Sequence, residues 1–133
     1  ISRTLIMYIF RLINRTENAS ALLDKSMTME TVLAYIDENF KRKLTLDEVA
    51  EKCYTSKYYL SHLFTRFQGV SIGKYILDKK IDESKKMLAS SDFPVVTIAE
   101  SLGFDDPSYY SRIFKKNVGI TPLQFRKTAS SDK

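Results

Sequence analysis

The sequence predicts an all-α protein with two helix-turn-helix subdomains joined by a long linker helix. Three observations support this fold class. The 133 residues include only four glycines and three prolines, so the residues that punctuate β structure are scarce. Apolar residues recur at helical intervals, and one block of the chain is repeated. A hydrophobic content of 44% is enough to build the cores that such a fold requires.

The repeat aligns residues 48–75 with residues 97–125. The matched pairs are Ala50 and Ala99, Glu51 and Glu100, Tyr59 and Tyr109, Ser61 and Ser111, Phe64 and Phe114, and Gly69 and Gly119. The first two pairs lie 49 residues apart and the other four lie 50 apart, so one residue has been inserted between the two blocks. A turn at 54–55 or at 103–104 would absorb the insertion.

Each copy is expected to contain a short helix, a turn and a longer helix. In the first copy, Thr45 and Glu48 form a capping box that starts a helix running to about Cys53, and Ser56 caps the next helix. The longer helix has an apolar stripe that must be buried, consisting of Leu60, Leu63, Phe64 and Phe67.

A helix from Ile72 to about Ser90 is expected to join the copies, because its apolar residues keep helical spacing. At 1.5 Å per residue it would be about 28 Å long. Lys79, Lys80, Lys85 and Lys86 alternate with Asp78, Asp82 and Glu83, a pattern typical of a solvated face with ion pairs four residues apart.

In the second copy, Asp106 supplies the N-cap and Pro107 the first helical position of the longer helix. Its mostly apolar stripe consists of Tyr110, Ile113, Phe114 and Asn117. Thr121 and Pro122 start a final helix in the same way. The predicted organisation is an N-terminal helix in 1–25, a first subdomain in 26–70, the linker in 71–91, and a second subdomain with a frayed tail in 92–133.

Positive charge gathers on the longer helix of each copy. The chain carries a formal net charge of +5, which favours an anionic partner. Residues 45–53 contain three acids and one lysine, and residues 97–102 contain one acid, whereas the longer helices contain none. The cations of the longer helices are Lys57, Arg66, Arg112, Lys115 and Lys116. Since the apolar stripe anchors each longer helix, the basic and hydroxyl side chains are expected to face something anionic.

A helix pair whose second helix is basic suits the DNA major groove. Lysine and arginine neutralise phosphates, while arginine and hydroxyl groups read base edges. Adjacent major-groove segments on one face of DNA lie roughly 34 Å apart, close to the expected length of the linker. One chain could therefore place both longer helices in consecutive major-groove segments.

Over about residues 27–127 the chain resembles the DNA-binding domain of AraC/XylS-type bacterial transcription regulators. The resemblance is carried by Ser56, Tyr59-Leu60-Ser61, Phe64, Gly69, Ser71 and Tyr75-Ile76, and then by Ile98-Ala99, Gly103-Phe104, Asp106, Tyr109-Tyr110-Ser111-Arg112, Phe114-Lys115-Lys116, Gly119, Thr121-Pro122 and Phe125-Arg126. It implies sequence-specific binding to double-stranded promoter DNA by a transcription regulator. An activator with RNA polymerase as a partner is expected, and a repressor is the alternative that the sequence leaves open. The groove-facing residues that it implies are Lys57, Tyr58, Ser61, His62, Ser108, Tyr109, Ser111 and Arg112.

The chain departs from the family pattern at a few positions, which are mainly packing positions. Lys80 replaces the usual arginine, Ser84 a common alanine, Tyr110 a phenylalanine and Phe125 a tyrosine.

The N-terminal residues lie outside the resemblance. Leu5, Ile9, Leu12 and Ile13 form an amphipathic pattern. This helix either packs on the DNA-binding domain or is the remnant of an absent sensing or dimerisation domain and pairs with its own copy. The second alternative, which makes a homodimer, is favoured.

Other classes of protein fit less well. The one cysteine, Cys53, excludes an internal disulfide and suits a cytoplasmic protein, and it is expected to pack in a core. With His62 as the one histidine, neither a metal site nor a cofactor is expected. No catalytic grouping indicates an enzyme, and the apolar run at 5–10 is too short to span a membrane.

A helix-turn-helix protein-interaction module is the alternative function, although such a surface would usually carry both signs of charge.

Overall fold

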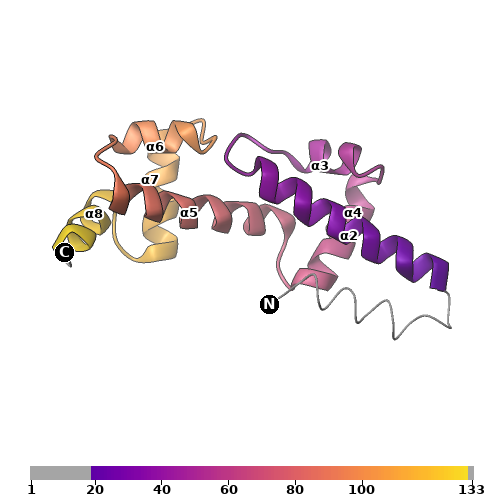
Figure 1. The fold of residues 1–133 in the computed structure, drawn as a ribbon. Coiled ribbons are helices and arrows are strands. Elements are labelled where there is room, and N and C mark those ends of the chain that lie inside the picture. The colour runs from indigo at the N-terminus through magenta and orange to yellow at the C-terminus, as the bar shows by residue number, and fades with distance from the viewer. Residues whose placement is uncertain (1–18, 132–133) are drawn as a thin grey trace. The chain divides into compact units, whose positions relative to one another are not determined.

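The computed structural model describes residues 19–131, with side-chain surroundings for residues 29–130. Within that part of the chain the secondary structure is helical throughout and no strand occurs, which confirms the all-α prediction (Figure 1). The helices are α2 (Ala19–Asn39), α3 (Leu46–Lys52), α4 (Lys57–Gln68), α5 (Ile72–Ser90), α6 (Val95–Ser101), α7 (Pro107–Val118) and α8 (Pro122–Ser131). The amphipathic pattern from Leu5 to Ile13 lies outside the described residues.

The chain divides into two compact units. Of the described residues, the first unit comprises 19–38 and 45–72, and the second comprises 39–44 and 73–131. Helices α3 and α4 form the first helix-turn-helix copy, and α6 and α7 form the second (Figure 1). The short segment 39–44 thus belongs to the second unit, although it precedes α3 in the sequence. We call it the connecting segment.

The first unit is held by one face of α2 together with the apolar faces of α3 and α4. Its fully or nearly fully buried side chains are Met29, Val32, Leu33, Ile36, Val49, Ala50, Cys53, Leu60, Leu63, Phe64 and Ile72. The side-chain caps of Thr45 and Ser56 are present as predicted: Thr45 Oγ1 accepts a hydrogen bond from the Glu48 amide at 3.1 Å, which is the Thr45 half of the predicted capping box, and Ser56 Oγ accepts one from the Tyr59 amide at 3.1 Å. The Glu48 carboxylate accepts a further hydrogen bond from the Tyr35 hydroxyl.

The second unit has a separate core built from α5, α6 and α7. Its buried residues are Ile81, Leu88, Ile98, Ala99, Leu102, Phe104, Tyr110 and Phe114. Asp106 caps α7 as predicted, with Oδ1 2.9 Å from the Ser108 amide. Thr121 and Gln124 cap α8 reciprocally, because each side chain accepts from the other residue's amide, at 3.1 and 2.9 Å. Of the predicted α7 stripe, only Asn117 is exposed.

The turns of the two copies locate the inserted residue. The Thr55 amide donates to the carbonyl of Ala50, and the Phe104 amide donates in the same way to Ala99, each at 3.0 Å. The two turns therefore match through Thr55 and Phe104, and the extra residue of the second copy is Asp105.

One expectation from the sequence is wrong. The alternating charges predict that Lys80 lies on a solvated face of α5, yet Lys80 is only 7% exposed. Its Nζ donates to the carbonyl oxygens of Phe40 at 2.6 Å, Arg42 at 2.7 Å and Leu102 at 2.5 Å. Burial, followed by the charge of Arg42, lowers the pKa of Lys80 to about 8. The charge pattern could not reveal that the connecting segment folds over this part of α5.

Gly103 allows the backbone of the connecting segment to approach the turn between α6 and α7. Its φ is 82°, a left-handed conformation that favours glycine. A Cβ atom at this position would lie 2.4 Å from the backbone carbon of Arg42 and 2.4 Å from the nitrogen of Lys43. The absence of a side chain is therefore required both by the turn and by the packing of the second unit.

Candidate nucleic-acid interface

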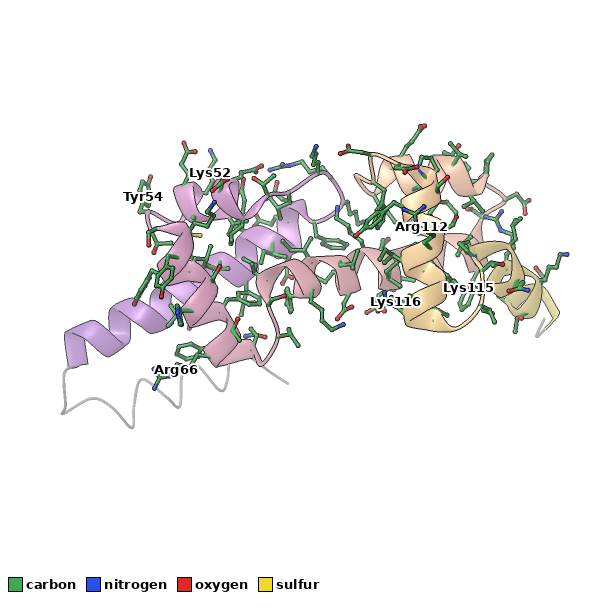
Figure 2. The ribbon with its side chains drawn as sticks, turned by 180° about the vertical axis from the view of Figure 1, so that it is seen from behind. Lys52, Tyr54, Arg66, Arg112, Lys115 and Lys116 are labelled. Atoms are coloured by element: carbon green, nitrogen blue, oxygen red, sulfur yellow. The ribbon has the colours of Figure 1, made fainter. Side chains whose placement is uncertain are left out.

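Helix α4 presents a polar surface because its apolar stripe is buried. It begins at Lys57 after the Ser56 cap and ends at Gln68, where Gly69 adopts a φ of 78°. Figure 2 shows Arg66 among the side chains of this unit. The predicted α4 residues all reach solvent: Lys57, Tyr58, His62 and Arg66 are exposed, and Ser61 is half-buried.

Two of these α4 side chains support each other. The rings of Tyr58 and His62 lie 4.9 Å apart, and His62 Nε2 is 3.2 Å from the Tyr58 hydroxyl oxygen. Lys57 Nζ lies 3.3 Å from Asp47 Oδ1 of α3, in an exposed pair that stabilises little. A phosphate can compete for such a lysine, so this ion pair is compatible with a DNA contact.

Helix α7 carries the stronger positive charge. Its sequence from Pro107 to Val118 contains three cations and no acid. Arg112, Lys115 and Lys116 are exposed and are distributed along this one helix in Figure 2. Ser108 and Tyr109 are also exposed, and Ser111 is half-buried.

Arg112 is oriented by an aromatic neighbour. Its guanidinium carbon lies 6.0 Å from the centre of the Tyr109 ring, within the range of a cation–π interaction. The Tyr109 ring in turn lies 6.3 Å from the ring of Phe104. A planar guanidinium on the exposed side of α7, beside an aromatic ring, is suited to bidentate hydrogen bonding with a guanine edge.

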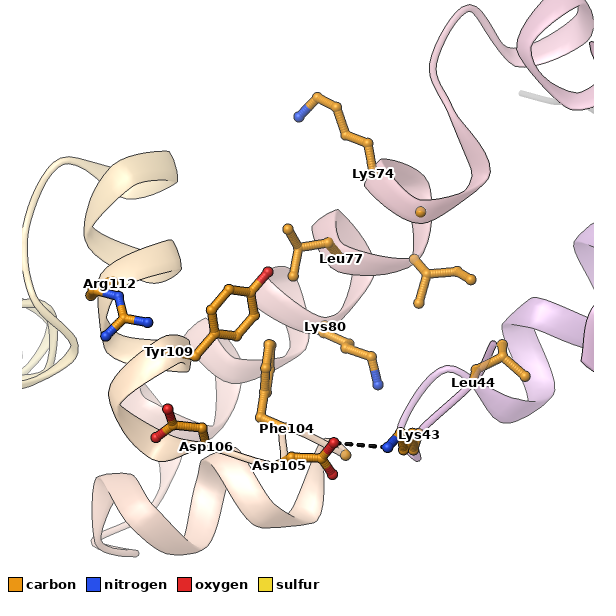
Figure 3. Close-up of a pocket in the computed structure, with 13 residues that line it drawn as sticks. Lys43, Leu44, Lys74, Leu77, Lys80, Phe104, Asp105, Asp106, Tyr109 and Arg112 are labelled. Carbon is orange, nitrogen blue, oxygen red and sulfur yellow. Dashed lines mark hydrogen bonds and ion pairs between the residues drawn. The ribbon is translucent and has the colours of Figure 1, made fainter. Parts of the chain in front are cut away.

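A groove of about 670 Å³ lies beside α7, and all its lining residues belong to the second unit. Tyr109 and Arg112 of α7 form part of its wall, and Leu77 and Lys80 of α5 form another part (Figure 3). Lys43 Nζ and Asp105 Oδ2 meet at 2.8 Å, and the hydrogen bond and charge of Asp105 raise the pKa of Lys43.

The structure therefore gathers the predicted residues into one exposed set on α4 and another on α7, each within its own unit. Lys74, which lines the groove at the start of α5, was not predicted from the sequence. It pairs with Asp78 of its own helix at 3.3 Å, as an ordinary surface lysine does. No feature of the one-dimensional pattern distinguishes Lys74 from the lysines later in that helix.

Other kinds of site receive no support from the described residues. Among residues 19–131, no group of three or more histidine, cysteine or acidic side chains is placed to hold a metal ion. The helices of this region also include none long and apolar enough to cross a membrane. Cys53 is buried, and burial raises the pKa of its thiol, as expected for a packing residue.

The fold and the basic faces define a protein of the helix-turn-helix class. A helix-turn-helix domain family matches residues 49–128. The chain is 31% identical to the multiple antibiotic resistance protein MarA of Escherichia coli, over 77% of this chain and 81% of MarA. It is 32% identical to the regulatory protein PocR of Salmonella typhimurium, over 74% of this chain but only 33% of PocR.

A solved structure agrees with these relatives. The C-terminal domain of the two-component response regulator yesN from Fusobacterium nucleatum matches 74% of this chain and 96% of its own, with a TM-score of 0.71 and 33% identity. The chain belongs to the AraC/XylS family of helix-turn-helix transcription regulators. It spans about a third of the length of PocR.

Proposed function

We propose that this chain binds double-stranded promoter DNA with sequence specificity, using α4 and α7 as recognition helices. The observation that carries the proposal is the separation of faces on both helices. Each buries an apolar stripe and exposes cations and hydroxyl groups without an acid. Such a face neutralises phosphates and offers hydrogen-bond donors to base edges.

The proposed contacts fall into two kinds. Arg112 reads a base, because its guanidinium can donate two parallel hydrogen bonds to guanine. Ser108, Tyr109 and Ser111 surround it on α7, and on α4 the corresponding set is Lys57, Tyr58, Ser61 and His62. Arg66, Lys115 and Lys116 lie toward the ends of their helices and contact phosphates.

The wider role follows from the family and is part of the proposal. The two recognition helices enter consecutive major-groove segments of one promoter, and the protein activates transcription in the bacterial cytoplasm through contact with RNA polymerase. The chain acts by binding and not as an enzyme. A homodimer formed through residues 1–25 completes the proposed assembly, although residues 1–18 lie outside the described part of the chain.

The salt dependence of DNA binding tests this function. Fragments bound by the protein are selected from genomic DNA, and the affinity for one of them is measured by mobility shift at several salt concentrations. Log K should fall with log salt by about 0.9 for each phosphate neutralised. A flat response would favour the alternative function, a protein-interaction module without direct DNA readout.

A further inference from the structure

We infer that the groove beside α7 receives the sugar–phosphate backbone of one DNA strand, with Lys74 as a phosphate contact and Asp105 as a charge that weakens binding there. This inference rests on the proposed function. It extends the interface beyond the recognition helix, onto α5 and the connecting segment.

The lining of the groove fits a chain of sugars and phosphates. Leu77, Phe104 and the Tyr109 ring provide apolar surface. The charged lining residues are the cations Lys43, Lys74, Lys80 and Arg112 and the acids Asp105 and Asp106. With four cations against two acids, the groove favours an anion, and its apolar surface favours one with a hydrocarbon portion such as deoxyribose.

Two of these charges are committed to the fold. The three carbonyl oxygens of Phe40, Arg42 and Leu102 accept from the Lys80 ammonium, and the Asp106 carboxylate caps α7. These two groups shape the groove and do not contact a ligand. The remaining cations that line the groove are Lys43, Lys74 and Arg112.

Lys74 is suited to this contact. Its Nζ lies 3.3 Å from both carboxylate oxygens of Asp78, and the Lys74 side chain is 54% exposed. Because an exposed pair of this kind is weak, a phosphate can share or replace Asp78. Figure 3 shows Tyr109 directed from α7 toward α5, which carries Leu77 and Lys74. Since Tyr109 and Arg112 belong to the proposed recognition surface, the groove continues that surface.

Asp105 has the opposite effect. It is the inserted residue of the second copy, and its side chain is 73% exposed at the groove, where its carboxylate pairs with Lys43 at 2.8 Å. The carboxylate both occupies Lys43 and repels an approaching phosphate. Removing its charge therefore makes the net charge of the groove more positive by one and releases Lys43 from this ion pair.

Three charge variants test the inference in fluorescence-anisotropy titrations of a selected duplex across a salt series. Lys74→Ala should reduce the steepness of the log K against log salt line by about 0.9, so a fourfold rise in salt shrinks the wild-type advantage by about 3.5-fold. Asp105→Asn should strengthen binding and steepen the line. Lys86→Ala is the matched control, because Lys86 is also an α5 lysine paired with an acid of its own helix but does not line the groove.

A phosphate contact also predicts what will not change. Lys74→Ala should leave the ratio of affinities for selected and unrelated duplexes unaltered, because a phosphate carries no base identity. Ethylation interference should lose one phosphate signal in Lys74→Ala and keep it in Lys86→Ala. If the wild type binds DNA with a steep salt dependence but Lys74→Ala behaves like Lys86→Ala, the groove has another occupant and this inference is overturned. If the wild type shows no salt-dependent binding, the proposed function itself fails.

Discussion

The two helix-turn-helix copies differ most at the turn between their helices. In the first copy the turn holds Tyr54 at a φ of 55°, with its side chain 97% exposed (Figure 2). In the second copy the equivalent residue is Gly103, against which the connecting segment packs. Lys80 and the Lys43–Asp105 pair add further contacts to that same segment. Two turns with matching backbone hydrogen bonds are thus supported in different ways.

The difference indicates how each recognition helix is held in place. The turn before α7 packs against other parts of its unit and is hydrogen bonded to them. The turn before α4 instead contains Tyr54, whose side chain is exposed to solvent. A recognition residue is more effective when its supporting structure is rigid. We therefore expect α7 to contribute more to base discrimination than α4, and substitutions in the second turn to cost more stability than those in the first.

The largest effect is expected from Lys80→Met. The change removes a buried charge and leaves the carbonyls of Phe40, Arg42 and Leu102 without this donor. The free energy of unfolding should fall by about 4 kcal/mol, measured by urea denaturation. Lys80→Arg is the control, because a guanidinium supplies several donors at the same position. Equal stability of the Met variant and the wild type would show that Lys80 does not hold the connecting segment.

Gly103→Ala should cause the second largest loss of stability. Alanine at this position would be held in an unfavourable left-handed backbone conformation, and its Cβ would clash with the backbone of Arg42 and Lys43. We expect a loss of about 3 kcal/mol in unfolding free energy. The matched control is Gly69→Ala, since Gly69 has a φ of 78° but a Cβ added there would meet nothing within 4 Å. The control should cost only about 1 kcal/mol, and equal losses in the two variants would contradict close packing at Gly103.

Arg112→Ala should weaken binding to a selected duplex by about 2 kcal/mol and relax specificity at one or two base pairs. The equivalent change in the first copy is His62→Ala, because residues 62 and 112 are 50 positions apart in the repeat. His62→Ala should have the smaller effect on specificity, measured by competition with duplexes altered at single base pairs. A larger effect for His62→Ala would reverse the assignment of α7 as the main reader.

Tyr54→Gly should give the smallest change in stability, and it should stabilise the protein where the changes at Lys80 and Gly103 destabilise it. Glycine adopts a φ of 55° without the steric cost that tyrosine carries, and the exposed ring buries little surface. Stability should rise by about 0.5 kcal/mol in thermal unfolding. Tyr54→Ala keeps a Cβ in the left-handed conformation and should not gain as much. If Tyr54→Gly is destabilising, the first turn depends on contacts that its exposure does not suggest.

Local patterns in the sequence were sufficient for much of the fold. Thr45, Ser56 and Asp106 predicted helix starts because a cap acts within three residues of itself, and the structure confirms all three. The apolar periodicity within each copy predicted the longer helices, and the repeat extended the same reading from one copy to the other. The extent of α5, Ile72–Ser90, also agrees with the periodicity of its apolar residues.

Contacts between distant segments were beyond such reasoning. Lys80 meets carbonyls 38 and 40 residues earlier in the chain, and no local pattern distinguishes it from a solvated lysine. Lys74 enters the candidate site for a similar reason, because the groove forms only when α5, α7 and the connecting segment pack together. The groove-facing residues of α4 and α7 could be proposed from the sequence because the resemblance to the AraC/XylS family implies them, and the basic residues of each helix are evident without any contact to a distant segment.

The central claim is that the exposed faces of α4 and α7 bind duplex DNA, and amide chemical-shift mapping by NMR tests it most directly. A selected duplex is titrated into isotope-labelled protein while the shifts of all four helices of the repeats are followed. We predict the largest changes along the exposed face of α4 from Lys57 to Arg66 and along α7 from Ser108 to Lys116, with smaller changes in α3 and α6. Changes that concentrate on the acidic helices α3 and α6, and leave α4 and α7 unaffected, would contradict the claim.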